Sequence, residues 1–83
     1  MGRLEKLCEV VLSGRADANV RFDDLRFLLA RLGFDERVLG SHHIFVRSGV
    51  DEILNVRPRS GGMAKPYQVN QVRDVIRKYG MEV

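Results

Sequence analysis

The spacing of the apolar residues changes twice along this chain, and these changes limit the folds open to it. Apolar side chains recur every three or four residues over 3–13 and again over 22–32, which predicts two amphipathic helices. Over 34–56 they instead form short stretches rich in Val, Ile and Phe between glycines, which is typical of strands. The helical spacing returns over 66–80, which begins with a proline and ends with a glycine, so a third helix is predicted there.

Three strands are expected between the second and third helices, over about residues 34–39, 42–47 and 52–57. The last two should form an antiparallel hairpin around the sequence RSGVDE. The segment RPRSGGMAK, which follows them, is predicted to be a loop because of its proline and its two adjacent glycines. The element order is therefore ααβββα. It predicts an α+β fold in which helices cover one face of a three-stranded antiparallel sheet and leave the other open.

The length of 83 residues suits one domain, residues 1–83, of which residues 1–20 would be an N-terminal helical extension. The single cysteine, Cys8, cannot form an internal disulfide and argues for a reducing compartment. Charged residues interrupt the apolar residues of the N-terminal segment, so neither a signal peptide nor a membrane span is expected there. We therefore expect a cytoplasmic protein that has no membrane partner.

The net charge of +3 arises entirely from residues 41–83, because residues 1–40 carry equal numbers of basic and acidic side chains. Most of the basic residues are arginine, the residue best suited to bidentate contacts with phosphate. This distribution predicts an anionic partner near the second half of the chain. A solvated charged surface would explain the charge alone equally well.

Both histidines of the chain are adjacent, in the sequence GSHHIF. Because side chains alternate across a strand, His42 and His43 should point to opposite faces of the sheet. Phe45 is the largest apolar residue nearby and should pack under the helices, which places His43 on the covered face and His42 on the open face. Gly40 would let a ligand approach the backbone, and Ser41 adds a hydroxyl. A half-buried structural histidine is the simpler interpretation of either ring.

Four basic residues of the neighbouring strands and the following loop are expected to bind phosphates: Arg47, Arg57, Arg59 and Lys65. In such surroundings a histidine can act as a general acid or base on RNA, whose 2′-hydroxyl is an internal nucleophile. This chemistry needs neither a metal nor another cofactor. The sequence also shows no cluster of His, Asp and Glu with the spacing of metal ligands.

The segments LLARLGF, GSHHIF and KPYQVNQVRDVIRKYGM together resemble the HicA-type toxins of bacterial toxin–antitoxin modules, over residues 21–81. The resemblance implies a double-stranded-RNA-binding-like fold, ribosome-independent cleavage of mRNA by one histidine, and neutralisation by a HicB-type antitoxin. The family's catalytic histidine directly follows Gly-Ser, so it corresponds to His42, and the motif residues correspond to Gly40 and Ser41. His43 is a possible second catalytic residue.

The chain departs from this family pattern in two places. Many members carry a Pro-x-His element after the third strand, where this chain has Arg57, Pro58 and Arg59. The predicted helix over 3–13 is also additional to the shortest members. A non-catalytic RNA-binding module of the same fold is therefore the alternative function, and a protein-interaction domain without RNA affinity is a third.

The antitoxin is expected to cover the open face of the sheet. Ile44 and Val46 should lie on that face beside His42 and offer apolar contact area. The arginines around them would favour an acidic surface on the partner. Packing of both residues under a loop or under the first helix is the competing interpretation.

Overall fold

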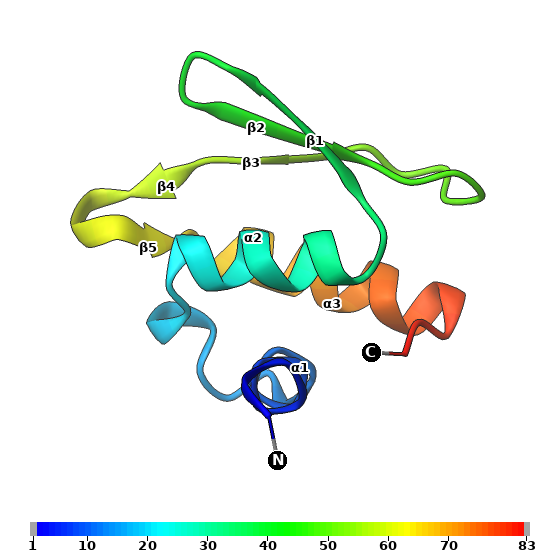
Figure 1. Cartoon of the computed structure of the whole chain (residues 1–83). Coiled ribbons are helices and arrows are strands. Elements are labelled where there is room, and N and C mark those ends of the chain that lie inside the picture. Colours follow the sequence, from blue (N-terminus) through cyan, green and yellow to red (C-terminus); the bar gives the residue numbers. More distant parts are fainter. Residues whose placement is uncertain (1, 83) are drawn as a thin grey trace.

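The computed structural model describes residues 2–82 and has the predicted order ααβββα (Figure 1). Its helices are α1 (Arg3–Ser13), α2 (Phe22–Arg31) and α3 (Pro66–Tyr79). The strands of its main sheet are β1 (Asp35–Leu39), β2 (His42–Val46) and β3 (Leu54–Val56). Both pairs of neighbouring strands are antiparallel, in the order β1-β2-β3. The α+β class and the three-stranded antiparallel sheet are thus confirmed.

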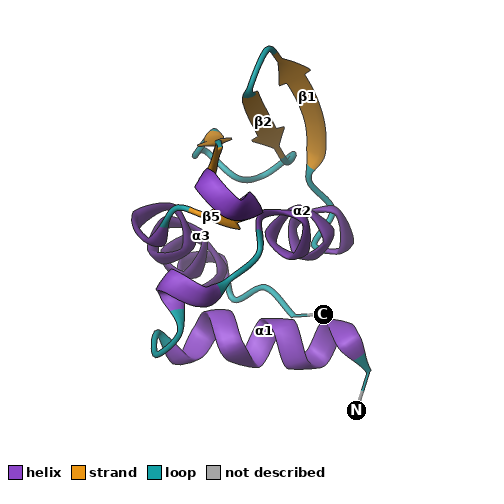
Figure 2. Cartoon of the chain, turned by 90° about the vertical axis from the view of Figure 1, so that its left-hand side faces the viewer, coloured by secondary structure: helices purple, strands orange, loops and turns teal. Residues whose placement is uncertain are grey.

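The elements form three layers, which Figures 1 and 2 show from two directions. The sheet is one outer layer, α2 and α3 form the middle layer, and α1 lies on the far side of these two helices. As predicted, all helices are on one side of the sheet. The other face of the sheet has no element of the described chain packed on it.

The core lies between the sheet and the middle helices. Phe45, Leu54 and Val56 of the sheet are fully buried there. The helices contribute residues at helical spacing, of which the most deeply buried are Leu25, Leu28, Leu29, Val69 and Val72. Complete burial of one such side chain stabilises a fold by about 1.5–3 kcal/mol. This packing determines which face of β2 is covered.

Two arginines of α3 attach the N-terminal helix to the rest of the fold. Arg73 is buried and donates hydrogen bonds to the Val11 carbonyl oxygen (3.0 Å) and to both carboxylate oxygens of Asp17 (2.9 and 3.0 Å). Arg77 donates to the Leu12 carbonyl oxygen (2.8 Å). The last carbonyls of a helix lack partners within the helix and carry partial negative charge, so both contacts stabilise the end of α1.

The third strand is shorter than the predicted range of 52–57, because the residues before it bond to α3. The backbone N–H of Asp51 donates to the hydroxyl of Tyr79 (3.1 Å), and that hydroxyl donates to Glu52 (2.7 Å). Lys78 donates to the same carboxylate (2.8 Å). These contacts lower the pKa of Glu52 to about 2, chiefly through the hydrogen bonds from Lys78 and Tyr79.

The segment predicted as a loop after β3 contains a small hairpin. Strands β4 (Pro58–Arg59) and β5 (Met63–Ala64) pair antiparallel around the 3-10 turn η2 (Ser60–Gly62). The backbone N–H of Ala64 also donates to the carbonyl oxygen of Val20 (2.8 Å). The prediction of a loop was therefore wrong for these residues. The hairpin is held in part by the carbonyl oxygen of Val20, before α2, which is far away in the sequence and could not be read from the local pattern.

Candidate functional site

Gly40 and Ser41 form the tight turn between β1 and β2, directly before His42. Leu39 and His42 are direct partners in the antiparallel register, so the connection has only these two residues. Gly40 has a φ of 62°, in the left-handed region that favours glycine, as the first position of a type II′ hairpin turn requires. Its role in the structure is thus to set the turn and with it the register of both histidines.

The two histidines lie on opposite faces of the sheet, as the alternation predicts. Phe45 is fully buried under the helices, and His43 shares its face of β2. His42 lies on the other face, together with Ile44. The pairing of Ile44 with Asn55 places Asn55 on this open face as well.

His43 is held in place by contacts on the covered face. Its Nδ1 lies 2.6 Å from Oε2 of Glu36, and its ring meets the Phe22 ring edge-on, with centroids 4.8 Å apart. Arg26 of α2 binds the same carboxylate through Nε (2.7 Å) and Nη2 (3.1 Å). The side chain of His43 is only 15% exposed. These contacts connect β1 and β2 to α2.

The carboxylate in this cluster is ionised at neutral pH. The hydrogen bond from Arg26 lowers the pKa of Glu36, and the hydrogen bond from His43 adds to the effect. A carboxylate is an acceptor only, so Nδ1 of His43 carries the proton in this contact. His43 therefore serves as a donor that fixes the β1–β2 hairpin.

His42 has a different partner and a more open environment. Its Nδ1 lies 3.1 Å from the side-chain amide oxygen Oδ1 of Asn55. An amide oxygen can only accept, so Nδ1 carries the proton in this contact, and in the neutral form of the ring the lone pair is then on Nε2. A neutral imidazole with a free Nε2 is the form that a general base requires.

His42 lines a shallow cavity of about 370 Å³ between the sheet and the start of α3. The lining residues are His42, Asn55, Arg57, Lys65, Tyr67, Gln68 and Gln71. Two are cations, three carry side-chain amides, and none is a carboxylate. The lining thus favours an anionic ligand that also has hydrogen-bonding groups.

Gln68 takes the place of a neighbouring strand at the outer edge of β3. Its side chain is buried, with Oε1 accepting from the backbone N–H of Arg57 (3.1 Å) and Nε2 donating to the carbonyl oxygen of Asn55 (3.1 Å). An edge strand otherwise leaves such groups unpaired. This contact fixes the segment of β3 that carries Asn55, and so it supports His42 indirectly.

Two of the four predicted basic residues come together with His42. Arg57 and Lys65 line the same cavity. The guanidinium of Arg59 instead donates to the carbonyl oxygens of Ala64 (3.2 Å) and Ala18 (2.6 Å), so it holds the β4–β5 hairpin against the segment before α2.

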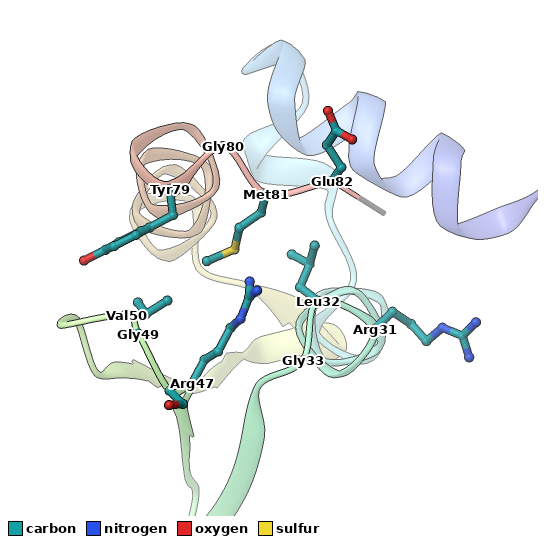
Figure 3. A pocket seen from close by; sticks show the side chains of 11 residues that line it. Arg31, Leu32, Gly33, Arg47, Gly49, Val50, Tyr79, Gly80, Met81 and Glu82 are labelled. Atoms are coloured by element: carbon teal, nitrogen blue, oxygen red, sulfur yellow. The ribbon is translucent and has the colours of Figure 1, made fainter.

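Arg47 lies near the other end of β2 from His42. It projects into a separate cavity of about 590 Å³, formed by the ends of α2 and α3 and the turn after β2 (Figure 3). Leu32, Val50 and Met81 provide the apolar part of that cavity. Arg47 is therefore not part of the site around His42.

Four residues of the His42 cavity were not predicted as site residues: Asn55, Tyr67, Gln68 and Gln71. A signal for Gln68 exists in the sequence, because positions 68, 72 and 76 share one face of a helix and the other two are apolar. The other three are polar or aromatic residues at exposed positions, which the hydrophobic pattern does not distinguish from ordinary surface.

Within residues 2–82, no three His, Cys, Asp or Glu side chains gather as they would around a metal ion. Over the same residues, none of the helices combines the length and the apolar character needed to cross a bilayer. No family model, curated protein or solved structure matches the chain.

Proposed function

We propose that this protein is a HicA-type toxin, an endoribonuclease that cleaves mRNA with His42 as its general acid and base. One observation carries the proposal: Asn55 orients His42 so that Nε2 is free, in a cavity that also contains Arg57 and Lys65. A base beside two cations suits a reaction at a phosphodiester.

The reaction that fits this arrangement uses the 2′-hydroxyl of RNA as nucleophile. Nε2 of His42 takes the proton of the 2′-hydroxyl as the 2′-oxygen attacks the adjacent phosphorus. The bond to the 5′-oxygen of the next nucleotide breaks, and protonated His42 returns the proton to that leaving oxygen. The products are a 2′,3′-cyclic phosphate and a 5′-hydroxyl. Arg57 and Lys65 would stabilise the negative charge that develops on the phosphoryl oxygens.

The two sequence segments that carry most of the resemblance to HicA toxins meet at this cavity. GSHHIF supplies His42, and KPYQVNQ supplies Lys65, Tyr67 and Gln71. These segments are distant in the sequence, so their convergence on one cavity supports a shared role. A resemblance in sequence does not by itself require the two segments to meet in the fold.

We further propose that a HicB-type antitoxin inhibits the protein by covering the open face of the sheet. Val46 and Ile53 are large apolar residues that are 45% and 63% exposed, and Ile44 lies between Val46 and His42 on β2. Exposed apolar residues next to a basic site favour a partner with an apolar centre and an acidic rim. The replacement Ile53→Asp should weaken such a complex, and charge reversal at Arg57 should weaken it further.

The direct test is cleavage of a defined single-stranded RNA by the purified protein in the presence of EDTA. The proposal predicts products with 2′,3′-cyclic phosphate ends, and no cleavage where the attacking nucleotide is replaced by its 2′-deoxy form. Binding without cleavage would instead support the non-catalytic RNA-binding module. No affinity for RNA even at low salt would support the protein-interaction domain.

A matched pair of charge variants locates the bound RNA. Arg57→Ala should reduce the dependence of log affinity on log salt by about 0.7, the value for one phosphate contact with a single strand. Arg15→Ala removes the same charge from an exposed position next to α1 and should leave that slope unchanged. Equal slopes for both variants would place the RNA away from the His42 cavity.

A further inference from the structure

The two tyrosines of the chain have very different environments. Tyr79 is partly buried, and its hydroxyl both donates to Glu52 (2.7 Å) and accepts from the Asp51 backbone (3.1 Å). Tyr67 is 64% exposed, and its hydroxyl makes no hydrogen bond with any residue of 2–82. The contacts of Tyr79 explain its place in the fold, whereas no comparable contacts explain Tyr67.

The backbone of Tyr67 nevertheless belongs to a well-fixed element beside His42. It lies in the first turn of α3, directly after Pro66, which is pre-organised for the start of a helix. The next residue, Gln68, is buried and bonded to β3 at both ends of its amide. Tyr67 and His42 line the same cavity, so a ligand bound at His42 lies within reach of the ring.

The other groups of this cavity select among the ligands that an exposed ring can bind. Lys65 lies 6.0 Å from the centre of the Tyr67 ring, and Arg57 adds a second cation. Gln71 offers an amide that can both donate and accept. An aromatic platform beside cations is the combination with which proteins bind single-stranded nucleic acid: bases stack on the ring and phosphates meet the cations.

A second, more apolar cavity on the sheet differs in character. Its lining from β1 and β2 consists of two carboxylates, one guanidinium and three aliphatic side chains: Asp35, Glu36, Arg37, Leu39, Ile44 and Val46. The carboxylates outnumber the single cation, and the aliphatic side chains suit a protein surface better than a base. The difference between the cavities favours nucleic acid, rather than a protein partner, as the ligand of Tyr67.

We infer that Tyr67 is the stacking platform for one unpaired base of single-stranded RNA, next to the phosphate held by Arg57 and Lys65. The inference rests on the proposed function for the choice of RNA as ligand. It adds to the proposed function that the substrate must be unpaired at that nucleotide and that Tyr67 is the residue that contacts the unpaired base. Tyr67 is thus a binding residue that positions the scissile phosphate at His42.

The test uses the full chain with His42→Ala, so that RNA stays intact during binding measurements. Affinity for a short fluorescein-labelled RNA is measured by fluorescence anisotropy for this protein and with Tyr67→Phe or Tyr67→Ala added. Loss of one base–aromatic stack should weaken binding by about 5- to 150-fold for Tyr67→Ala, whereas Tyr67→Phe should retain the affinity. Val10→Ala, an exposed apolar residue on α1, is the matched control and should have no effect.

An abasic scan of the RNA then identifies the stacked base. The loss caused by Tyr67→Ala should vanish when one particular nucleotide lacks its base and persist at all other positions. It should also be absent with a duplex of the same sequence. Equal losses at every abasic position, an equal loss with the duplex, or a loss for Tyr67→Phe as large as for Tyr67→Ala would overturn the inference.

The inference and the proposed function fail in different ways. The protein with intact His42 could cleave RNA while the affinity loss caused by Tyr67→Ala depends on no single base. That result would overturn only the inference. The loss caused by Tyr67→Ala could instead depend on one base in a protein that does not cleave RNA. That result would support the inference and overturn the proposed endoribonuclease activity. The absence of any RNA binding would overturn both.

Discussion

His42 and His43 are adjacent in the chain, yet the fold gives them different chemical environments. His43 faces the helices, donates to an ionised carboxylate and packs against Phe22. His42 faces outward, is oriented by a neutral amide and lines a cavity with two cations. The comparison shows that the strand, more than the residue type, decides which imidazole is free to react.

The partner of Nδ1 explains much of this difference. Glu36 bears a full negative charge and is itself held by Arg26, so removal of His43 would disturb a cluster of charges. Asn55 is neutral, so its contact with His42 orients the ring without forming an ion pair.

The largest expected effect is on catalysis. His42→Ala should lower kcat for RNA cleavage by about 10²–10⁴-fold, the usual contribution of a positioned general acid or base. His43→Ala should leave kcat per folded molecule close to that of the parent protein. Single-turnover cleavage, corrected for the folded fraction, measures both. Equal losses in the two variants would contradict the separation of roles.

The order of effects should reverse for stability. His43→Ala removes the contact with Phe22 and the hydrogen bond to Glu36, and should lower the free energy of unfolding by about 1–3 kcal/mol. His42→Ala changes a surface contact and should cost less than about 0.5 kcal/mol. Urea unfolding of both variants tests this. A larger cost for His42→Ala would show that His42 is the structural residue of the pair.

Replacement of Gln68 should alter the structure only on the side of the sheet that carries His42. Gln68→Leu keeps the helix but leaves the Arg57 N–H and the Asn55 carbonyl without their partner, so we expect a loss of about 1–2 kcal/mol in stability. Asn55 would also be less well fixed, so Gln68→Leu should cleave RNA more slowly than the parent protein. Gln71→Leu, one turn along the same helix and exposed, is the control for stability and should have little effect on it.

The smallest expected effect is the pH dependence of the stability that Glu36, the partner of His43, contributes. The pKa of Glu36 is lower in the folded protein than its usual value of 4.5, so the unfolded chain is protonated first as the pH falls. The stabilisation due to Glu36 is therefore complete above about pH 4.5 and is lost as the pH falls through the lowered pKa.

The measurement for this prediction is the difference in unfolding free energy between the parent protein and Glu36→Gln. It should shrink from neutral pH towards acid. Glu52 titrates in the same direction in both proteins and cancels in the difference. A difference that is constant with pH would show that the charge of Glu36 adds no stability.

The sequence was enough to predict that helices cover one face of the sheet and which residues lie on each face. Changes in hydrophobic spacing gave the element order, and the position of Phe45 assigned His42 and His43 to opposite faces. Both arguments depend on local geometry, which a sequence determines directly.

The partners of the polar residues could not be predicted in the same way. Gln68 replaces a strand at the edge of β3, and Arg59 binds the carbonyl of Ala18, but nothing in the local pattern brings these groups together. Such contacts depend on how the finished elements pack. They explain why Arg59 is not part of the cavity, whereas Arg47 is excluded by its place near the other end of β2.

Chemical rescue tests the central claim most directly. His42→Gly and His43→Gly are each assayed for RNA cleavage with increasing concentrations of imidazole. The account predicts that His42→Gly is inactive and that imidazole restores its cleavage in a saturable manner, because the free base takes the place of the missing ring. His43→Gly should cleave without imidazole and gain nothing from it. Rescue of His43→Gly instead, or full activity of His42→Gly without imidazole, would contradict the claim that His42 transfers the proton.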